Sequence, residues 1–337
     1  MQGHDGTMRA LIVGFGSIGR RHARNLRNQV PDAQIRVLRM SDLPDSVMAD
    51  LGAERVGSIA EGLRWKPDLA VIASPTALHL ETLGPLLAAG IPCYLEKPVV
   101  ASGEQVDELA RIVARLPRIP AVQIGCNLRF LPSLKRLREL VRGGELGGVV
   151  RATLEVGQWL PDWRAGQDYR STYSASTAAG GGVVLDLVHE IDMARWLFGE
   201  LECAGSAVGR LSGLDIDAED TAAGVFVGSG SSGPIVTVAM DYVSRVRMRR
   251  YSVVGTRASA VWDLAALTLS VADGASVREV TQTPDDFDVG TTYVQSMSAF
   301  LNTVRSGAAP TIPLEDGLAT TRLALAMRDN ALWVRVR

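Results

Sequence analysis

A strand-like run, a glycine-rich turn and a helix-like segment near the start of the chain constrain its fold more than any other stretch. Met8–Val13 has the apolar pattern of a buried strand, and Gly14-Phe15-Gly16-Ser17-Ile18-Gly19 follows it directly before a segment of helical spacing. This order is the fingerprint of a dinucleotide-binding βαβ unit. Its glycines allow a tight turn, close approach of a pyrophosphate and close helix–strand packing. The predicted pyrophosphate-binding residues are Gly14, Phe15, Gly16, Ser17, Ile18 and Gly19.

The end of the next predicted strand bears on which dinucleotide binds. Gln34–Leu38 reads as that strand, and Arg39 follows it, 20 residues after Gly19. A site that prefers NAD usually has an acidic residue there, which holds the ribose 2′-hydroxyl, whereas an arginine pairs with a 2′-phosphate. We therefore predict NADP(H), with Ser41 assisting Arg39. The alternative is NAD, with Asp42 as the acidic residue.

Alternating strand-like and helix-like segments predict a doubly wound parallel sheet for the first half of the chain. Polar turns follow its predicted strands, and such turns at the carboxyl ends of parallel strands are where this fold contacts its ligand. The turns begin with Ser74-Pro75-Thr76, with Glu96-Lys97-Pro98 and with Asn127-Leu128-Arg129-Phe130.

Lys97 is the residue in these turns that is the strongest candidate for a chemical role. It is one of three lysines in a chain that takes most of its positive charge from arginine. A lysine at the end of a buried strand, beside Glu96 and before Pro98, is a candidate for catalysis. Considered alone, the tripeptide fits a surface turn equally well.

The second half begins with a strand-like alternation over Val149–Gln158 and continues into a polar loop rich in aromatic and arginine residues. Such a loop suits a hydroxyl-rich or anionic ligand, although a solvated loop is the simpler interpretation. Further on, three glycines lead into a predicted helix that ends at Phe198 and carries Asp186 and His189. Residues three apart share a helix face, where a carboxylate can orient an imidazole for proton transfer. The alternative is a histidine that only caps or packs.

Taken in order, these motifs resemble the Gfo/Idh/MocA oxidoreductases, which include glucose–fructose oxidoreductase and inositol dehydrogenase. The resemblance rests on Gly-Phe-Gly-Ser-Ile-Gly-Arg-Arg-His, Ala-Ser-Pro-Thr-Ala-Leu-His, Glu-Lys-Pro and Asn-Leu-Arg-Phe, and it runs nearly end to end. It implies an α/β protein with a Rossmann domain over residues 8–125. A second α+β domain, with a large open, mostly antiparallel sheet, would cover residues 126–337 and carry the substrate and oligomer contacts.

The resemblance also implies roles for individual residues. Lys97, Asp186 and His189 would form a catalytic triad, with a cis bond often preceding the proline after the lysine. In many members the positions of Asp186 and His189 are four residues apart, whereas here they are three apart. This spacing resembles a subgroup linked to amino-sugar and sialic-acid-type pathways. It leaves Asp192 as an alternative polar partner. Further cofactor contacts would come from Ser74, Pro75, Thr76, His79, Glu96, Lys97, Asn127, Trp163 and Arg164. The substrate would contact Lys97, Arg164, Tyr169, Arg170, Tyr173, Asp186 and His189.

Composition gives no indication of a nucleic-acid or membrane partner. The net charge is −2 with 21% charged residues, and the sequence contains no apolar run of 18 residues. Cys93, Cys126 and Cys203 are scattered and fit free thiols in a reducing cytoplasm, without metal-ligand spacing. We interpret Met1–Thr7 as a polar leader that is not a signal peptide. The open sheet predicts a homo-oligomer, a dimer or tetramer.

The sequence thus favours an NADP(H)-dependent oxidoreductase acting on a secondary alcohol or ketone carbon of a sugar, amino sugar, sugar nucleotide or polyol. His189 would exchange the hydroxyl proton, Lys97 would stabilise the reacting oxygen, and Asp186 would orient the histidine or a substrate hydroxyl. Two alternatives remain open. One is a catalytically silent NAD(P)-binding sensor on the same fold, and the other is an enzyme that retains NAD and oxidises its substrate transiently, as in a glycosidase or epimerase cycle.

Overall fold

The computed structural model describes residues 6–164, 166–229 and 233–335 and divides into two units. The first unit contains Met1–Cys126 and Tyr293–Leu318, and the second contains Asn127–Thr292 and Ala319–Arg337. Most of the proposed leader lies outside the described residues. The prediction placed residues 293–318 in the second domain, whereas here they group with the first unit; the predicted boundary at residue 125 stays a prediction.

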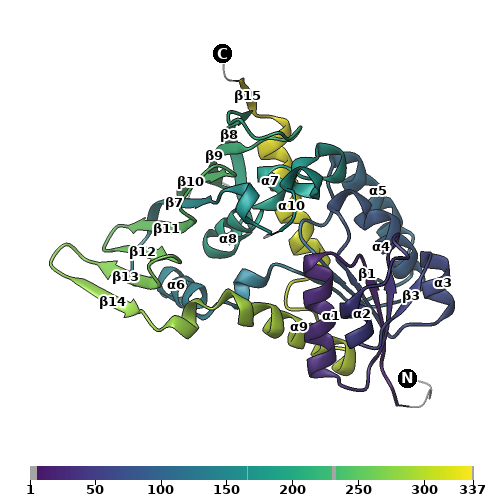
Figure 1. The fold of residues 1–337 in the computed structure, drawn as a ribbon. Helices are drawn as coiled ribbons and strands as arrows, with labels where there is room; N and C mark the ends of the chain where they lie inside the picture. The colour runs from purple at the N-terminus through teal and green to yellow at the C-terminus, as the bar shows by residue number, and fades with distance from the viewer. Residues whose placement is uncertain (1–5, 165, 230–232, 336–337) are drawn as a thin grey trace. The chain divides into compact units, whose positions relative to one another are not determined.

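The first unit is built on a six-stranded parallel sheet (Figure 1). Its strand order is β3-β2-β1-β4-β5-β6, so the order reverses between β1 and β4. In open α/β sheets a ligand binds outside the carboxyl ends of the strands at such a reversal. The strands are β1 (Arg9–Val13), β2 (Gln34–Leu38), β3 (Glu54–Val56), β4 (Leu69–Ile72), β5 (Cys93–Leu95) and β6 (Val122–Ile124).

The helices of this unit form where the sequence provides caps and an apolar face. The Ser102 side chain accepts a hydrogen bond from Gln105 N at the start of one helix, and Ser58 caps another through Glu61 N. Met297, Phe300 and Leu301 complete the buried cluster over β1 and β2, which explains why residues 293–318 belong to this unit. The helices are α1 (Ser17–Gln29), α2 (Ser46–Asp50), α3 (Ile59–Arg64), α4 (His79–Ala88), α5 (Gly103–Ala114) and the larger part of α9 (Val289–Ser306).

The second unit is built on a nine-stranded mixed sheet of order β14-β13-β12-β11-β7-β10-β9-β8-β15. Most neighbours are antiparallel; β7 with β10 and β8 with β15 are parallel. Buried and partly exposed residues alternate along β10, as expected for a sheet with one covered face. The strands are β7 (Val149–Gly157), β8 (Leu201–Arg210), β9 (Thr221–Gly228), β10 (Ile235–Asp241), β11 (Met248–Gly255), β12 (Ser259–Asp263), β13 (Thr268–Ala272), β14 (Val277–Thr281) and β15 (Leu332–Arg335).

The covered face of this sheet contacts α6 (Pro132–Arg142), α7 (Val183–Asp186) and α8 (His189–Phe198). The prediction of one continuous helix through Asp186 and His189 is wrong. α7 ends at Asp186 and α8 begins at His189, because Leu187 leaves the helical conformation at φ −97° and ψ 26°. The last helix, α10, spans Leu314–Asp329, and the chain then joins the sheet as β15.

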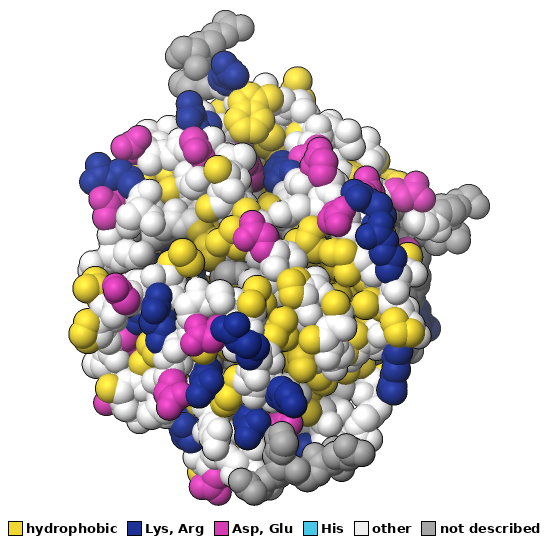
Figure 2. All heavy atoms as spheres, turned by 90° about the vertical axis from the view of Figure 1, so that its right-hand side faces the viewer, with side chains coloured by type: hydrophobic (Ala, Val, Ile, Leu, Met, Phe, Trp, Pro, Cys, Tyr) yellow, Lys and Arg dark blue, Asp and Glu magenta, His cyan; other side chains and the backbone are white. Residues whose placement is uncertain are grey.

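The surface has no single dominant charge. Figure 2 shows basic and acidic side chains interspersed over one face, with apolar side chains between them. This mixture matches the small net charge of −2. Within the described residues, no helix is both long and apolar enough to cross a membrane.

The predicted fold class is confirmed: a parallel doubly wound sheet and a large, mostly antiparallel sheet occur in one chain.

Candidate active site

The glycine turn after β1 has the geometry that a dinucleotide needs. A methyl group on Gly14, where φ is +85°, would lie 2.6 Å from Ser74 N, and one on Gly19 would overlap the carbonyl oxygen of Gly14. A methyl group on Gly16 would meet nothing within 4 Å, so the backbone is open at this position. Gly16 caps α1 without any side-chain hydrogen bond. The free N–H groups of this helix end therefore fit a pyrophosphate.

The turns after β4 and β5 lie next to this glycine turn, because β1, β4 and β5 are neighbours in the sheet. His79 joins the two turns. Its Nδ1 lies 3.0 Å from Pro98 O and its Nε2 lies 3.0 Å from Ser74 O. The His79 ring is buried, and burial lowers the pKa of the imidazole. These contacts join the turns after β4 and β5, and the contact of His79 with the cofactor stays a prediction.

Glu96 and Lys97 are held by a residue that sequence reasoning did not select. The His22 ring is fully buried on α1, and its Nε2 lies 2.6 Å from Glu96 Oε1. The other carboxylate oxygen accepts a hydrogen bond of 3.3 Å from Lys97 N. A methyl group on Gly125 would meet the Glu96 carboxylate at 3.0 Å. The helix that follows the glycine turn therefore also fixes the backbone of Lys97. The Lys97–Pro98 bond is cis, as the resemblance implied.

Three arginines and one carboxylate gather at the end of β2. Asp45 Oδ2 lies 2.6 Å from Arg20 Nη2 and 3.1 Å from Arg39 Nη1. Arg55 Nε donates to Arg39 O at 3.2 Å. The Arg20 hydrogen bond and the nearby positive charges hold the pKa of the Asp45 carboxyl below its usual value. Two guanidinium groups therefore share a single carboxylate, Arg55 adds a third positive charge, and the group is net positive. Ser41, the predicted helper of Arg39, accepts a hydrogen bond from Leu43 N at 3.3 Å.

In the second unit, Asn127 and Asp192 make buried structural contacts. Asn127 Nδ2 donates to Thr292 Oγ1 at 2.6 Å. Asp192 accepts two hydrogen bonds from Arg129, at 2.9 Å from Nε and 2.6 Å from Nη2, and a third from Thr320 at 3.1 Å. Asp192 is therefore committed to a buried ion pair that ties the 127–130 turn to α8 and α10. This arrangement favours a structural role over the alternative of a polar partner in catalysis.

We predict that Asp192→Asn lowers the free energy of unfolding by about 3 kcal/mol, because the buried ion pair between Arg129 and Asp192 would lose its negative charge. Urea denaturation of the purified variant measures this. Glu139→Gln, which removes an exposed partner of Arg136, is the matched control and should cost at most about 0.5 kcal/mol. Full stability of the Asp192 variant together with lost turnover would instead place Asp192 in the catalytic machinery.

Asp186 is oriented by Tyr242, the second residue that sequence reasoning missed. The Tyr242 hydroxyl donates to Asp186 Oδ2 at 2.7 Å, and both side chains are buried. Burial and the Asp186 charge raise the pKa of Tyr242 well above its usual value, so the hydroxyl stays protonated and remains a donor. The Trp163 ring packs edge-on against Tyr242 with centroids 5.2 Å apart. The predicted residues Trp163 and Asp186 are thus linked through Tyr242.

Glu219 supports the turn that delivers α7. Its carboxylate accepts a hydrogen bond from Val184 N at 3.2 Å and occupies the space that any side chain on Gly182 would need. Gly182 also has φ of +105°, which only glycine adopts readily. Burial raises the pKa of Glu219. The lack of space for a side chain at Gly182 and its positive φ explain why this position of Gly180-Gly181-Gly182 is a glycine.

Among the predicted substrate residues of the 159–173 loop, Arg164, Tyr169 and Tyr173 contact one another or a neighbouring loop, whereas Arg170 is exposed. Arg164 lies over the Tyr173 ring, 5.4 Å from its centroid, and Tyr169 accepts a hydrogen bond from Asp215 N at 3.1 Å. Arg170 is exposed and forms an ion pair with Asp168 at 2.7 Å. Its role in substrate binding stays a prediction, as does that of every residue in this loop. In the described part of the chain, no group of three or more His, Cys, Asp or Glu side chains is placed to hold a metal ion.

A glycine turn at the reversal point of a doubly wound sheet, together with a second unit built on a large sheet, defines a two-unit protein with a nucleotide-binding fold. Residues 8–124 match a family model described as "Oxidoreductase family, NAD-binding Rossmann fold", and residues 134–261 match "GFO/IDH/MocA C-terminal domain". The chain belongs to the Gfo/Idh/MocA family of oxidoreductases, which confirms the resemblance seen in the motifs.

Curated relatives are about 30% identical. The rhizopine catabolism protein MocA of Rhizobium meliloti is 28% identical over 56% of this chain and 56% of its own length. Inositol 2-dehydrogenase 2 of Saccharopolyspora erythraea is 30% identical over 62% of this chain and 59% of its own. The uncharacterized oxidoreductase YrbE of Bacillus subtilis is 27% identical over 75% and 72%. The chain thus spans little more than half the length of the first two.

Solved structures share the fold along nearly the whole chain. Levoglucosan dehydrogenase in complex with NADH has a TM-score of 0.81 at 18% identity, covering 96% of this chain and 97% of that one. GenD2 from gentamicin A biosynthesis, in complex with NAD, has a TM-score of 0.78 at 22% identity, covering 96% and 94%. The UDP-N-acetylglucosamine 3-dehydrogenase GnnA of Acidithiobacillus ferrooxidans has a TM-score of 0.76 at 20% identity, covering 96% and 98%.

Proposed function

We propose that this protein is an NADP(H)-dependent dehydrogenase or reductase acting on a secondary alcohol or ketone carbon of a sugar-type substrate. Sugars, amino sugars, sugar nucleotides and polyols form the substrate class. The relatives named as an inositol dehydrogenase and as sugar dehydrogenases support this class. When bound, the nicotinamide supplies or accepts the hydride.

One observation carries the proposal: Lys97 follows β5 at the sheet edge that also holds the glycine turn after β1 and the Ser74 turn after β4. A group at the carboxyl edge of these three neighbouring strands is where a Rossmann fold presents chemistry to its cofactor. The buried His22–Glu96 pair fixes the Lys97 backbone. We assign Lys97 the role of hydrogen-bonding the reacting oxygen and stabilising its developing negative charge.

The second unit supplies the proposed proton-transfer residues. His189 exchanges the hydroxyl proton, because an imidazole titrates near neutral pH. Asp186, oriented by the Tyr242 hydroxyl, positions His189 or a substrate hydroxyl. Neither role requires the two residues to share one helix face.

The experiment that tests this function is an activity screen. The purified protein is mixed with NADP⁺ or NADPH and a panel of sugars, keto-sugars, sugar nucleotides and polyols, and absorbance of the reduced nicotinamide is followed. Turnover with at least one member supports the proposal. Tight binding of the cofactor with no turnover on any member favours a sensor, and retained NAD(H) with product formed but no net cofactor change favours transient oxidation.

The net positive end of β2 supports NADP(H) over NAD(H). Arg20 and Arg39 share one carboxylate, Asp45, and Arg55 donates to the Arg39 carbonyl oxygen, so a 2′-phosphate would supply further negative charge. Arg55 holds the backbone of Arg39 and Met40 in place for this contact.

We therefore predict that Arg39→Ala weakens NADPH binding by about tenfold to a hundredfold, the worth of a charge-assisted hydrogen bond, and changes NADH binding by less than about threefold. Fluorescence titration with each nucleotide measures both constants. Arg305→Ala, an exposed arginine on α9, is the matched control. Wild-type protein that binds NADH as tightly as NADPH would overturn the assignment.

The uncovered face of the nine-stranded sheet supports a homo-oligomer. Strand register places Val225, Ile235, Leu332 and Val334 on this one face. Ile235 is 54% exposed and Leu332 is 70% exposed. Apolar side chains gathered on one sheet face are typical of an interface. We propose a dimer or tetramer through this face. We also propose a cytoplasmic location, because all three cysteines are free thiols.

We predict that Ile235→Asp shifts the oligomer toward monomer, because a charge on this face would be desolvated in the interface. Sedimentation velocity measures the mass of the variant and of the wild type. Val246→Asp, an exposed apolar residue outside the strands, is the control and should leave the mass unchanged. A wild-type protein that sediments as a monomer at every concentration would contradict the proposal.

A further inference from the structure

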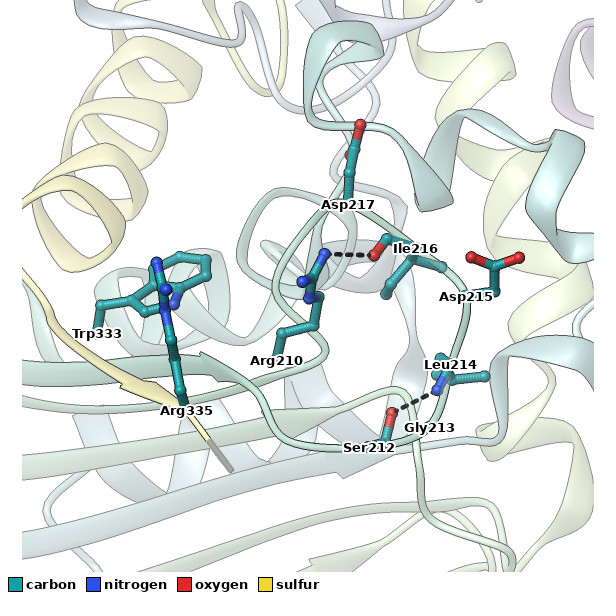
Figure 3. A pocket seen from close by; sticks show the side chains of 9 residues that line it. All are labelled: Arg210, Ser212, Gly213, Leu214, Asp215, Ile216, Asp217, Trp333 and Arg335. Carbon is teal, nitrogen blue, oxygen red and sulfur yellow. Dashed lines mark hydrogen bonds between the residues drawn. The ribbon is translucent and has the colours of Figure 1, made fainter. Parts of the chain in front are cut away.

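A pocket lies at the edge of the nine-stranded sheet, where its loop contacts the predicted substrate residues Tyr169 and Arg170. It has a volume of about 710 Å³ and is formed by the ends of β8 and β15 and by the 211–217 loop. Figure 3 shows Trp333 and Arg335 on one side, Arg210 in the centre, and the loop with Asp215 and Asp217 on the other side. All of these residues belong to the second unit.

Two arginines lie side by side on neighbouring strands of this pocket. Arg210 and Arg335 are direct partners in the parallel pairing of β8 with β15. Like charges at directly paired positions repel and destabilise a sheet. Arg210 Nη1 donates to Ile216 O at 3.0 Å, and within the described part of the chain neither arginine forms an ion pair with a carboxylate. The pair therefore lacks the anion that would neutralise it.

The acidic residues of the pocket are engaged with other partners. Asp217 Oδ1 accepts from Thr177 N at 2.6 Å, and Asp215 Oδ2 lies 4.0 Å from Arg170 Nη1. Buried Asp220 accepts from Ser212 N at 2.9 Å and from Ser212 Oγ at 2.6 Å, which fixes the start of the loop. The loop is thus held at Ser212 and Asp217, and among the described residues neither Asp215 nor Asp217 forms an ion pair with Arg210 or Arg335.

An indole lies on the same side of the pocket as Arg335 (Figure 3). Trp333 is two residues before Arg335 on β15, so the two side chains share a sheet face. It pairs with Val208, two residues before Arg210, and is 45% exposed. Guanidinium groups bind oxyanions through paired donors, and an exposed indole offers a flat apolar surface for a ring.

We propose that this pocket binds a small ligand in which a phosphate is joined to a flat ring, the chemistry of a nucleoside monophosphate. Arg210 and Arg335 contact the phosphate, and the Trp333 indole stacks on the ring. The 211–217 loop contacts the predicted substrate loop on its other side through Asp215 N and the Tyr169 hydroxyl. A ligand in the pocket would therefore contact a loop that is hydrogen-bonded to the predicted substrate loop.

Calorimetric titration tests this proposal with UMP as the probe and NADPH present at saturation, so that the glycine turn is occupied. We expect UMP to bind, and Arg210→Gln and Arg335→Gln each to weaken binding about tenfold or more. Trp333→Ala should weaken UMP binding but leave binding of inorganic phosphate unchanged. Arg305→Gln, remote from the pocket in sequence and exposed, should bind UMP as the wild type does.

Two results would overturn the proposal. The first is absence of UMP binding to the wild-type protein, and the second is binding that both arginine variants retain, which would place the nucleotide elsewhere. Inorganic phosphate that binds as tightly as UMP would refute the contact between ring and indole. Circular dichroism and the NADPH affinity of each variant show whether the fold is intact, so a loss of binding cannot be attributed to unfolding.

Discussion

Lys97→Ala is expected to lower turnover by about a hundredfold to a thousandfold, the usual cost of removing a donor that stabilises negative charge in the transition state. The affinity for NADPH should stay within about twofold, since one donor is lost while the glycine turn and the β2 end are intact. Steady-state kinetics and a fluorescence titration measure the two effects. The separation matters because a folding defect would reduce both.

Lys135→Ala is the matched control for this prediction. Lys135 is exposed on α6 and lies 5.5 Å from the Phe130 ring centroid, so its loss removes a surface cation and no proposed catalytic contact. Its turnover should equal that of the wild type. Near-normal turnover of Lys97→Ala would show that the lysine is only a turn residue.

His189→Ala is expected to lower turnover by about a hundredfold to ten-thousandfold, the range for loss of a general acid–base group. Added imidazole should restore part of the lost activity, because a free base can enter the space that the side chain leaves. Tyr242→Phe should give a smaller loss, about tenfold, since Asp186 would keep its charge and lose one hydrogen bond. Kinetics of both variants with and without imidazole measure these effects.

Imidazole also separates a chemical role of His189 from a structural one. A variant damaged in its packing would not respond to the added base, and Tyr242→Phe, which retains His189, should not respond either. Undiminished turnover of His189→Ala would remove the histidine from the mechanism. An equal loss in both variants, with no response to imidazole in either, would point to packing around Asp186.

The parts of the fold that depend on neighbouring residues were predictable from sequence. The glycine turn after β1 was predicted because all of its residues, Gly14 to Gly19, are contiguous in the sequence. The break at Leu187 was not predicted, since no proline or glycine marks it. β15 was not predicted either, because a short strand depends on its partner, here β8.

The supporting contacts of the candidate site were beyond sequence reasoning for the same reason. His22 and Glu96 are 74 positions apart, and Tyr242 and Asp186 are 56 apart. His22 stood within a recognised motif, but nothing near it indicated a carboxylate partner. Tyr242 stood among ordinary strand residues, and only folding reveals that its hydroxyl reaches Asp186. Such pairings arise from the order of strands in the sheets.

Isotope transfer tests the central claim most directly. The wild-type protein is mixed with a keto-sugar identified in the activity screen and with NADPH that carries deuterium at the transferable position of nicotinamide C4. Mass spectrometry then measures the deuterium content of the product. We predict one deuterium on the reduced carbon of each product molecule and an equal amount of NADP⁺, with both formed about a hundredfold to a thousandfold more slowly by Lys97→Ala. A product without deuterium, or NADPH that stays reduced with every substrate offered, would contradict the assignment of this chain as a hydride-transferring enzyme.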